Sequence, residues 1–135
     1  SAPDVSGNGR GWLVVWGEPS AIYGAQVHRT LALSRPFPIA RTPELTAPQV
    51  ETSGLDCLVL WQSGASTLGT RVTTPKQVGR VVTIANDDTG AAFFSCGGFA
   101  GNGTRFCVSG TTAPKDATWL YNDVWFGQFS PSLLR

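Results

Sequence analysis

Three cysteines and one histidine carry the most reactive side chains of this sequence. Cys96 and Cys107 flank a segment that has Asn102-Gly103 near its midpoint. An Asn-Gly pair is typical of a tight hairpin turn, so we expect the two cysteines to face each other on paired strands. Opposed positions on antiparallel strands lie close to disulfide range. The sequence therefore predicts a disulfide between Cys96 and Cys107.

The third cysteine, Cys57, is left over by this pairing. A catalytic thiol needs a basic neighbour, and the one histidine is His28; the sequence does not place the two side chains together. His28 is expected at the exposed end of a strand. Two interpretations of Cys57 stay open: a buried thiol that fills a core position, or a partner in an interchain disulfide.

Other residues offer little for catalysis or metal binding. The segment 86–90 (Asn-Asp-Asp-Thr-Gly) clusters oxygen ligands that could bind Ca²⁺, but it lacks the spacing of a calcium loop, and a solvated turn is favoured. No zinc-type spacing, phosphate loop or nucleophile elbow occurs. We therefore predict no metal, no cofactor and no catalytic residue.

Aromatic residues are the remaining candidates for a site. Trp16 and Trp61 are expected to pack between sheets, because large aromatic side chains bury much area. A second aromatic group near the C-terminus could form an exposed platform for a partner protein or a sugar ring. Its members are Trp119, Tyr121, Trp125 and Phe126. A protein partner or burial in a core is favoured over sugar binding.

Length and composition indicate one ordinary domain. The chain has 135 residues, of which 41% are hydrophobic and 14% charged, with a formal net charge of +1. This balance gives no electrostatic basis for nucleic-acid binding. No apolar run approaches the roughly 18 residues that span a bilayer, so no membrane insertion is expected. A Gly-rich, Lys-poor chain with cysteines favours an oxidising location: secreted, periplasmic or cell-envelope. The absence of Met further suggests a processed chain or a fragment.

An internal repeat organises the chain. Shifting the first third by 45 residues superposes it on the second, with many identical or similar residues at one offset. The matched pairs include Val5 and Val50, Leu13 and Leu58, Trp16 and Trp61, Gly24 and Gly69, Val27 and Val72, and Ile39 and Ile84. We divide the chain into units 1–45, 46–90 and 91–135.

Each complete unit is predicted to form four short strands. In the first unit these lie near Pro3–Ser6, Trp12–Trp16, Ile22–Val27 and Phe37–Ala40, where β-branched and aromatic runs are separated by turn residues. Asn8-Gly9, and more weakly Ser53-Gly54, predict hairpins between the first two strands of their units. No capped helical pattern is found. The chain is predicted to be all-β.

The third unit diverges from the other two. Phe106-Cys107-Val108 is aligned with Trp12-Leu13-Val14, and Phe126-Gly127 with Tyr23-Gly24. A lengthened loop is expected at Thr111 to Thr118, and no counterpart of the fourth strand follows Phe129. The predicted order is therefore ABCD, ABCD and ABC.

The repeat also has a recognisable sequence pattern. Its first copy reads Gly11-Trp12-Leu13-Val14-Val15-Trp16, then Ile22-Tyr23-Gly24-Ala25-Gln26-Val27, then Pro38-Ile39-Ala40. This pattern resembles a degenerate repeat of secreted, mostly bacterial, β-propeller-type proteins, over roughly the first 85 residues. The loops 17–20 and 62–65 lack the Asp and Arg that are usual in that repeat. The resemblance implies propeller-type blades, each a four-stranded sheet.

Such blades would be too few to close a ring, since closed propellers typically have 4–8. The remaining strands and blades would then come from other chains, a cleaved fragment or a second copy of this chain. A β-trefoil, which has three four-stranded units in one closed domain, is the alternative fold. We expect a non-catalytic structural or interaction subunit of a secreted or cell-envelope complex. The alternatives are a carbohydrate-binding lectin and a fragment of a larger propeller enzyme.

Overall fold

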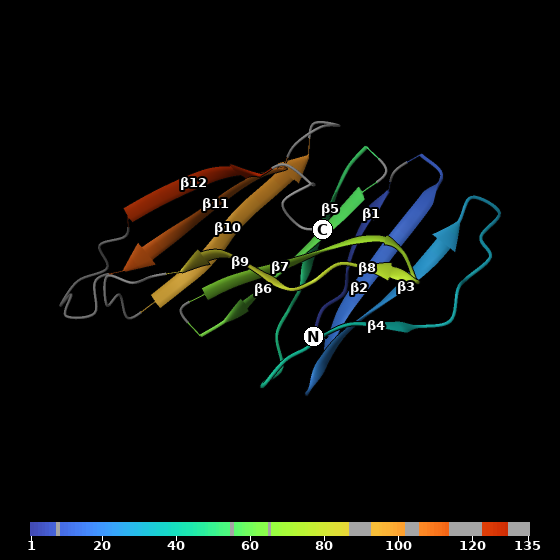
Figure 1. The fold of residues 1–135 in the computed structure, drawn as a ribbon, viewed down its shortest axis with the longest axis horizontal. Coiled ribbons are helices and arrows are strands. Elements are labelled where there is room, and N and C mark those ends of the chain that lie inside the picture. Colours follow the sequence, from blue (N-terminus) through green and yellow to red (C-terminus); the bar gives the residue numbers. More distant parts are fainter. Residues whose placement is uncertain are drawn as a thin grey trace.

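The computed structural model describes residues 1–7, 9–54, 56–64, 66–86, 93–101, 106–113 and 123–129; at residue 53 and from residue 85 onward it describes the backbone only. The described residues form twelve β-strands and no helix, in three antiparallel sheets. Figure 1 shows the sheets side by side in chain order, with β1–β4 at one end, β5–β9 in the middle and β10–β12 at the other end. The prediction of an all-β chain is confirmed.

The first sheet contains all four strands predicted for the first unit. They are β1 (Asp4–Gly7), β2 (Gly11–Glu18), β3 (Ala21–His28) and β4 (Phe37–Arg41), and they lie in this order. Gly9, between β1 and β2, has a φ of 81°, a conformation that glycine adopts without steric cost. Burial alternates along the middle of β2, as expected for a strand with one face on a core.

The second sheet has one strand more than predicted. It contains β5 (Gln49–Ser53), β6 (Asp56–Ser63), β7 (Ser66–Thr74), β8 (Gln77–Val78) and β9 (Val82–Asn86). The order is β5-β6-β7-β8, and β9 also pairs with β7. The prediction of four strands for this unit is therefore wrong, because it missed β8. This strand has two residues, too few to leave a pattern in the sequence.

The register of the second sheet repeats that of the first at an offset of 45 residues. The same pairs occur in both sheets: Val5↔Val14 and Val50↔Val59, Trp16↔Tyr23 and Trp61↔Leu68, and Val27↔Leu33 and Val72↔Val78. In the first sheet the last of these pairs is an isolated bridge, and in the second it belongs to β8. The repeat found in the sequence is thus also a repeat of strand pairing.

The third sheet contains β10 (Phe93–Gly101), β11 (Phe106–Ala113) and β12 (Asp123–Phe129), in the order β10-β11-β12. The three strands predicted for the third unit are therefore present. β11 runs through residues 111–113, where the sequence predicted the start of a loop, because these residues continue the ladder with β10 and β12. The rest of that predicted loop lies outside the described residues.

The register of the third sheet corrects its alignment with the other two. A glycine of the third strand faces an apolar residue of the second strand in each sheet: Val15↔Gly24, Leu60↔Gly69 and Val108↔Gly127. With Gly127 as the counterpart of Gly24, Val108 takes the position of Val15, and Phe106 that of Leu13. The alignment of Phe106 with Trp12 is therefore wrong by one residue, because divergent strands carry no sequence signal that fixes their register.

The two cysteines of the third unit are not directly opposed in this register. Cys96 pairs with Gly110, and Cys107 pairs with Ala100. A bridge between them would need a register shifted by several residues, because the Cα atoms of a disulfide lie within about 7 Å. Their side chains lie outside the described residues, so the Cys96–Cys107 disulfide stays a prediction.

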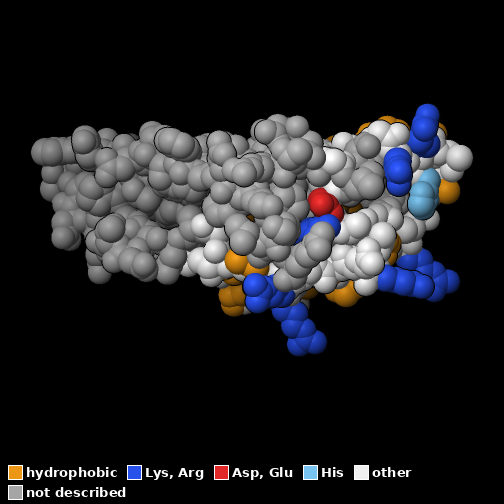
Figure 2. Space-filling model, turned by 45° about the horizontal axis from the view of Figure 1, so that its top comes forward, with side chains coloured by type: hydrophobic (Ala, Val, Ile, Leu, Met, Phe, Trp, Pro, Cys, Tyr) orange, Lys and Arg blue, Asp and Glu red, His pale blue; other side chains and the backbone are white. Residues whose placement is uncertain are grey.

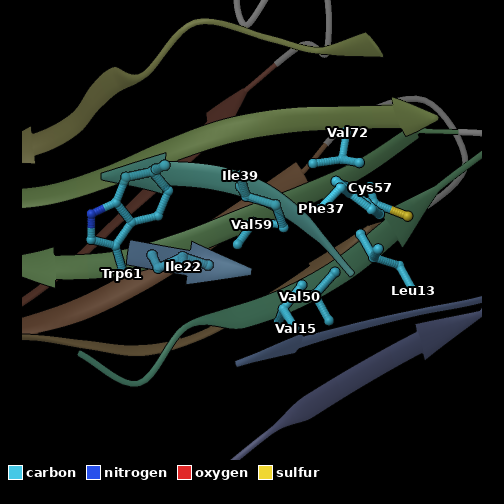
Figure 3. Packing of buried hydrophobic residues seen from close by; sticks show 11 residues of the cluster. Leu13, Val15, Ile22, Phe37, Ile39, Val50, Cys57, Val59, Trp61 and Val72 are labelled. Atoms are coloured by element: carbon cyan, nitrogen blue, oxygen red, sulfur yellow. The ribbon is translucent and has the colours of Figure 1, made fainter. Parts of the chain in front are cut away.

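The first and second sheets pack face to face around an apolar cluster. Its buried members are Leu13, Val15, Ile22, Phe37, Ile39 and Ala40 from the first sheet and Val50, Cys57, Val59, Trp61 and Val72 from the second. Figure 3 shows their side chains converging from strands of both sheets. At the edge, the Val50 amide donates to Oδ2 of Asp4 at 2.9 Å, and the hydroxyls of Ser6 and Thr52 lie 2.9 Å apart. These polar contacts fix how β5 lies against β1.

The second sheet is covered on both faces. Leu58 and Leu60 alternate along β6 with the cluster residues, and each is at most 1% exposed. They belong to the opposite face, and on that side β10 contacts β5, β6 and β7. β6 is consequently buried from Cys57 to Trp61, whereas its counterpart β2 is fully buried only at alternate positions. The three sheets form a stack, and the first sheet lies at one end of it.

Candidate interaction surface

The outer face of the first sheet is the surface that points away from the second sheet. Strand alternation places on it the residues between those of the core, namely Val5, Trp12, Val14, Trp16, Tyr23, Ala25 and Val27. All seven are apolar or aromatic, yet none is classed as buried. Val5 is 55% exposed and Trp12 44% exposed. We call this set the outer face.

Trp16 and Tyr23 form an aromatic pair on the outer face. They are cross-strand partners, and their ring centroids lie 6.3 Å apart with an angle of 21° between the planes. The indole Nε1 of Trp16 donates to Oε1 of Glu18 at 3.2 Å, in an exposed hydrogen bond. The stacking orders two large rings on the strands, so the pair presents a preformed aromatic surface.

The indole of Trp12 lies against β1 because the residue opposite Trp12 on that strand is a glycine. Gly7 is the cross-strand partner of Trp12, and a Cβ atom on Gly7 would lie only 2.8 Å from Cδ1 of the indole. The missing side chain therefore leaves room for the ring against β1. On the other side, Trp12 pairs with Val27 of β3. The indole thus extends the apolar outer face over three strands.

The equivalent face of the second sheet is almost wholly buried. Five of the seven residues 45 positions further on are buried in the apolar cluster: Val50 (2% exposed), Cys57 (7%), Val59 (0%), Trp61 (3%) and Val72 (1%). Thr70 is also buried, and Leu68, the counterpart of Tyr23, is partly buried against the cluster. The prediction that the repeated tryptophans pack between sheets is confirmed for Trp61. It is wrong for Trp16, which lies on the outer face with its indole hydrogen bond in solvent. The difference arises because the second sheet has a neighbour on that side.

Charged side chains are scattered on the face that Figure 2 shows. In this view the Lys and Arg side chains of the described residues lie in several separate places, with hydrophobic side chains between them. The ion pair between Arg71 and Asp56 is partly buried, and the Arg71 Nε donates to Oδ1 of Asp56 at 2.8 Å. The Thr73 hydroxyl donates to the same oxygen at 3.3 Å.

Cys57 and His28 line the same cleft, of about 290 Å³, at the edge between the first two sheets. His28 ends β3 and is exposed, as predicted. Burial, more than the charges of Asp56 and Glu51, raises the pKa of the Cys57 thiol, although a hydrogen bond with Thr52 opposes the shift. A raised pKa keeps the thiol neutral and unreactive. Cys57 is free and buried, so its described environment is that of a core residue.

The site residues predicted near the C-terminus are not tested. Trp119 and Tyr121 lie outside the described residues. Trp125 and Phe126 are described only as backbone positions of β12, opposite Gly110 and Ser109. In the segment 86–90, only the backbone of residue 86, the end of β9, is described.

The sequence reasoning missed the outer face. Trp12 and Tyr23 alternate with core residues and were assigned to strands, but nothing in their types separates a solvent face from a covered one. The repeat gave no signal either, because Trp16 and Trp61 have the same residue type in the same sequence context.

Comparison of the chain with protein families, curated proteins and solved structures finds no match. Among the described residues, no helix has the length and hydrophobicity needed to cross a membrane. In the same part of the chain, no three side chains among His, Cys, Asp and Glu gather as metal ligands would. The functional argument therefore depends on the geometry of the sheets.

Proposed function

We propose that the chain is a non-catalytic structural or interaction subunit, built of propeller-type blades, that joins other chains in a secreted or cell-envelope complex. One observation carries the proposal. The outer face of the first sheet is apolar and accessible, with Val5 and Trp12 exposed and its other five residues half-buried, whereas the equivalent face of the second sheet lies in a buried interface between sheets. A contiguous apolar face with aromatic residues is typical of an interaction surface.

The way the sheets stack supports the blade interpretation. Leu13 and Val15 of the first sheet point to the second, and their counterparts Leu58 and Leu60 point on toward the third. In both sheets this face is therefore the one that packs against the next sheet along the chain, as in successive blades of a propeller. No pairing among the described strands joins one sheet to another, which a closed trefoil barrel would require. This favours blades over the trefoil alternative.

The test is native mass spectrometry of the chain as isolated from its source, beside a Trp12→Glu variant expressed in the same source. We expect a complex larger than the 14.3 kDa chain for the unaltered protein. Trp12→Glu should reduce it strongly, because a carboxylate would be desolvated in the contact. Val81→Glu is the matched control, since Val81 is 47% exposed and lies between β8 and β9 of the second sheet. A lone chain in every sample would contradict the proposal.

Carbohydrate binding is the second candidate, and the aromatic rings of the outer face favour it. The Trp16–Tyr23 pair could stack on the apolar face of a sugar, while Glu18, already bonded to the Trp16 indole, could accept a hydroxyl bond. A glycan array with the unaltered chain and with Tyr23→Ala tests this. Binding that is lost in the variant would support a lectin, and an array without hits would remove it.

A further inference from the structure

We propose that the loop 29–36, which joins β3 to β4, docks the protein on an anionic lipid surface. In this contact Leu31 and Leu33 enter the headgroup region, and Arg29 and Arg35 bind lipid phosphates. The proposal goes beyond the proposed function, which concerns protein partners of the outer face. Figure 1 shows the loop projecting at the end of the molecule that the first sheet forms. Every residue from 28 to 33 is exposed.

The loop carries the two most exposed large hydrophobic side chains of the described residues. Leu31 is 74% exposed and Leu33 is 72% exposed. Leu33 forms an isolated bridge with Val27, so it borders the outer face, and Leu31 lies beyond it toward the end of the loop. Single apolar residues are common on protein surfaces, but neighbouring ones that project together mark a contact with a protein or a membrane.

The conformation of the loop is fixed by backbone hydrogen bonds. The His28 amide donates to the Ala32 carbonyl at 2.9 Å, the Leu31 amide to the His28 carbonyl at 2.8 Å, and the Ser34 amide to the Gln26 carbonyl at 2.8 Å. Leu31 has a φ of 66° and is the one non-glycine residue with a positive φ in the described part of the chain. Glycine or asparagine would adopt this conformation at lower cost. The backbone therefore does not explain a leucine here, and strain of this kind concentrates at functional sites.

The second unit shows that the fold does not need an apolar residue at this position. The residue 45 positions after Leu31 is Lys76, which is exposed in the turn between β7 and β8. The counterpart of Leu33 is Val78, which is partly buried against the apolar cluster. The pairing of Val78 with Val72 repeats the bridge of the first unit, yet here a charged residue forms the turn. The exposed leucine is thus a property of the first unit alone among these two.

The charge at this end of the first sheet complements an anionic surface. Arg29 and Arg35 are exposed within the loop, and exposed Arg10 directly precedes β2, whose first residue pairs with the last residue of β3. The carboxylates on the strands of this sheet lie at the other end, because Asp4 begins β1 and Glu18 ends β2. In Figure 2 basic and hydrophobic side chains lie together at the end of the molecule that the first sheet forms.

A lipid surface suits this loop better than a protein does. Stable protein interfaces bury about 800 Å² on each partner, around an apolar core enriched in aromatic residues. A projecting loop with two leucines does not offer such a face, whereas the outer face does. A bilayer accepts protruding aliphatic side chains at the boundary of headgroups and acyl chains, and anionic lipids attract arginines beside them. The contact is shallow and crosses no membrane.

The experiment is co-sedimentation of the purified chain with vesicles made of equal parts of phosphatidylcholine and phosphatidylglycerol, beside vesicles of phosphatidylcholine alone. We expect reversible binding to the anionic vesicles only, weakened by added salt. Leu31→Asn and Leu31→Gln should each reduce binding about ten-fold or more, because the apolar contact is lost. Arg29→Gln and Arg35→Gln should each reduce it about five-fold. Leu45→Asn is the matched control, since Leu45 is 55% exposed in the connection that leaves the other end of the sheet, and it should bind unchanged.

Urea unfolding separates lost binding from lost folding. Leu31→Asn relieves the left-handed conformation, so its midpoint should equal or exceed that of the unaltered chain while its vesicle binding falls. Unchanged binding by Leu31→Asn, or no binding of the unaltered chain to anionic vesicles, would overturn the proposal. Loss of binding with Trp12→Glu but not with Leu31→Asn would assign the lipid contact to the outer face and overturn it as well. The proposed function is tested separately, by the mass of the complex isolated from the source.

Discussion

Trp61 and Trp16 provide the sharpest test of the stack, because they occupy equivalent positions in successive sheets. Trp61 is 3% exposed within the apolar cluster, and Trp16 lies on the outer face. The two substitutions Trp61→Ala and Trp16→Ala remove the same atoms from the same strand position. Any difference between their effects on the free energy of unfolding therefore reports whether a neighbouring sheet covers the side chain.

The structure sets the size of the expected difference. Replacing a fully buried tryptophan with alanine costs about 3–5 kcal/mol, from lost transfer free energy and the cavity left behind. For Trp16 the main loss is its ring contact with Tyr23, and such pairs contribute about 0.5–1.5 kcal/mol. The exposed hydrogen bond to Glu18 adds little, because water replaces it. We expect Trp61→Ala to be more destabilising by about 2 kcal/mol or more.

The assay is urea unfolding followed by circular dichroism at several protein concentrations. At low concentration the midpoint of Trp61→Ala should fall well below that of Trp16→Ala, with similar denaturant slopes. If the chain assembles through the outer face as proposed, the cost of Trp16→Ala should grow at higher concentration, because assembly would stabilise only the unaltered chain. The milder pair Trp61→Phe and Trp16→Phe serves if Trp61→Ala does not fold. Equal costs at the lowest concentration would refute the inference that one face is covered and the other bare.

Three further substitutions or reactions test separate parts of the fold. Gly17→Ala should lower the free energy of unfolding by about 1–3 kcal/mol, because a methyl group there would meet the backbone carbonyl of Thr46. Asp56→Ala should cost about 1.5–3 kcal/mol, because it leaves the partly buried Arg71 without its carboxylate. The Cys57 thiol should react with iodoacetamide far more slowly in the folded chain than in urea, because burial raises its pKa. Its contribution to stability is complete below the ordinary thiol pKa of about 8.5 and is lost as the pH rises through the raised value.

Each of these predictions has a matched control. Gly7→Ala should cost less than Gly17→Ala, because its methyl group would crowd the indole of Trp12, a side chain that can move, while the nearest backbone atom, the Gly11 carbonyl oxygen, lies 3.4 Å away. Asp56→Asn keeps an acceptor for Arg71 and should recover part of the loss. Equal effects of the two glycine substitutions would contradict the close approach at Gly17. Rapid alkylation of Cys57 in the folded chain would show that the cleft admits the reagent to the thiol.

Strand positions in the first two units were predictable because their alternation and turn residues are strong. The four strands of the first unit were placed within one or two residues of β1–β4, and Gly9 adopts the positive φ that the Asn-Gly turn implied. Chain-local patterns of this kind need no knowledge of the neighbours. The two-residue strand β8 has no such pattern, since its pairing with Val72 depends on how the chain returns to β7.

The register of β11, and which sheet faces are covered by a neighbouring sheet, could not be predicted for a different reason. The slip of one residue at Phe106 arises because either register keeps apolar residues on β11, and the sequence does not say which face is buried. Likewise the sequence gives Trp16 and Trp61 the same residue type in the same context. Only the position of each sheet in the stack decides that one is buried and the other is not.

The outer face is best understood as a sheet interface that lacks its second half. Val14 and Trp16 have the residue types of Val59 and Trp61, and their strands pair in the same register, yet the second pair is buried and the first is not. Where the second sheet has Cys57, the first has the larger Trp12, so the exposed face is more aromatic than its buried counterpart. Leaving such a surface in water forgoes free energy that burial would supply. The hydrophobic force that packs the first sheet on the second therefore also favours burial of the outer face, which is the physical basis of the proposed assembly.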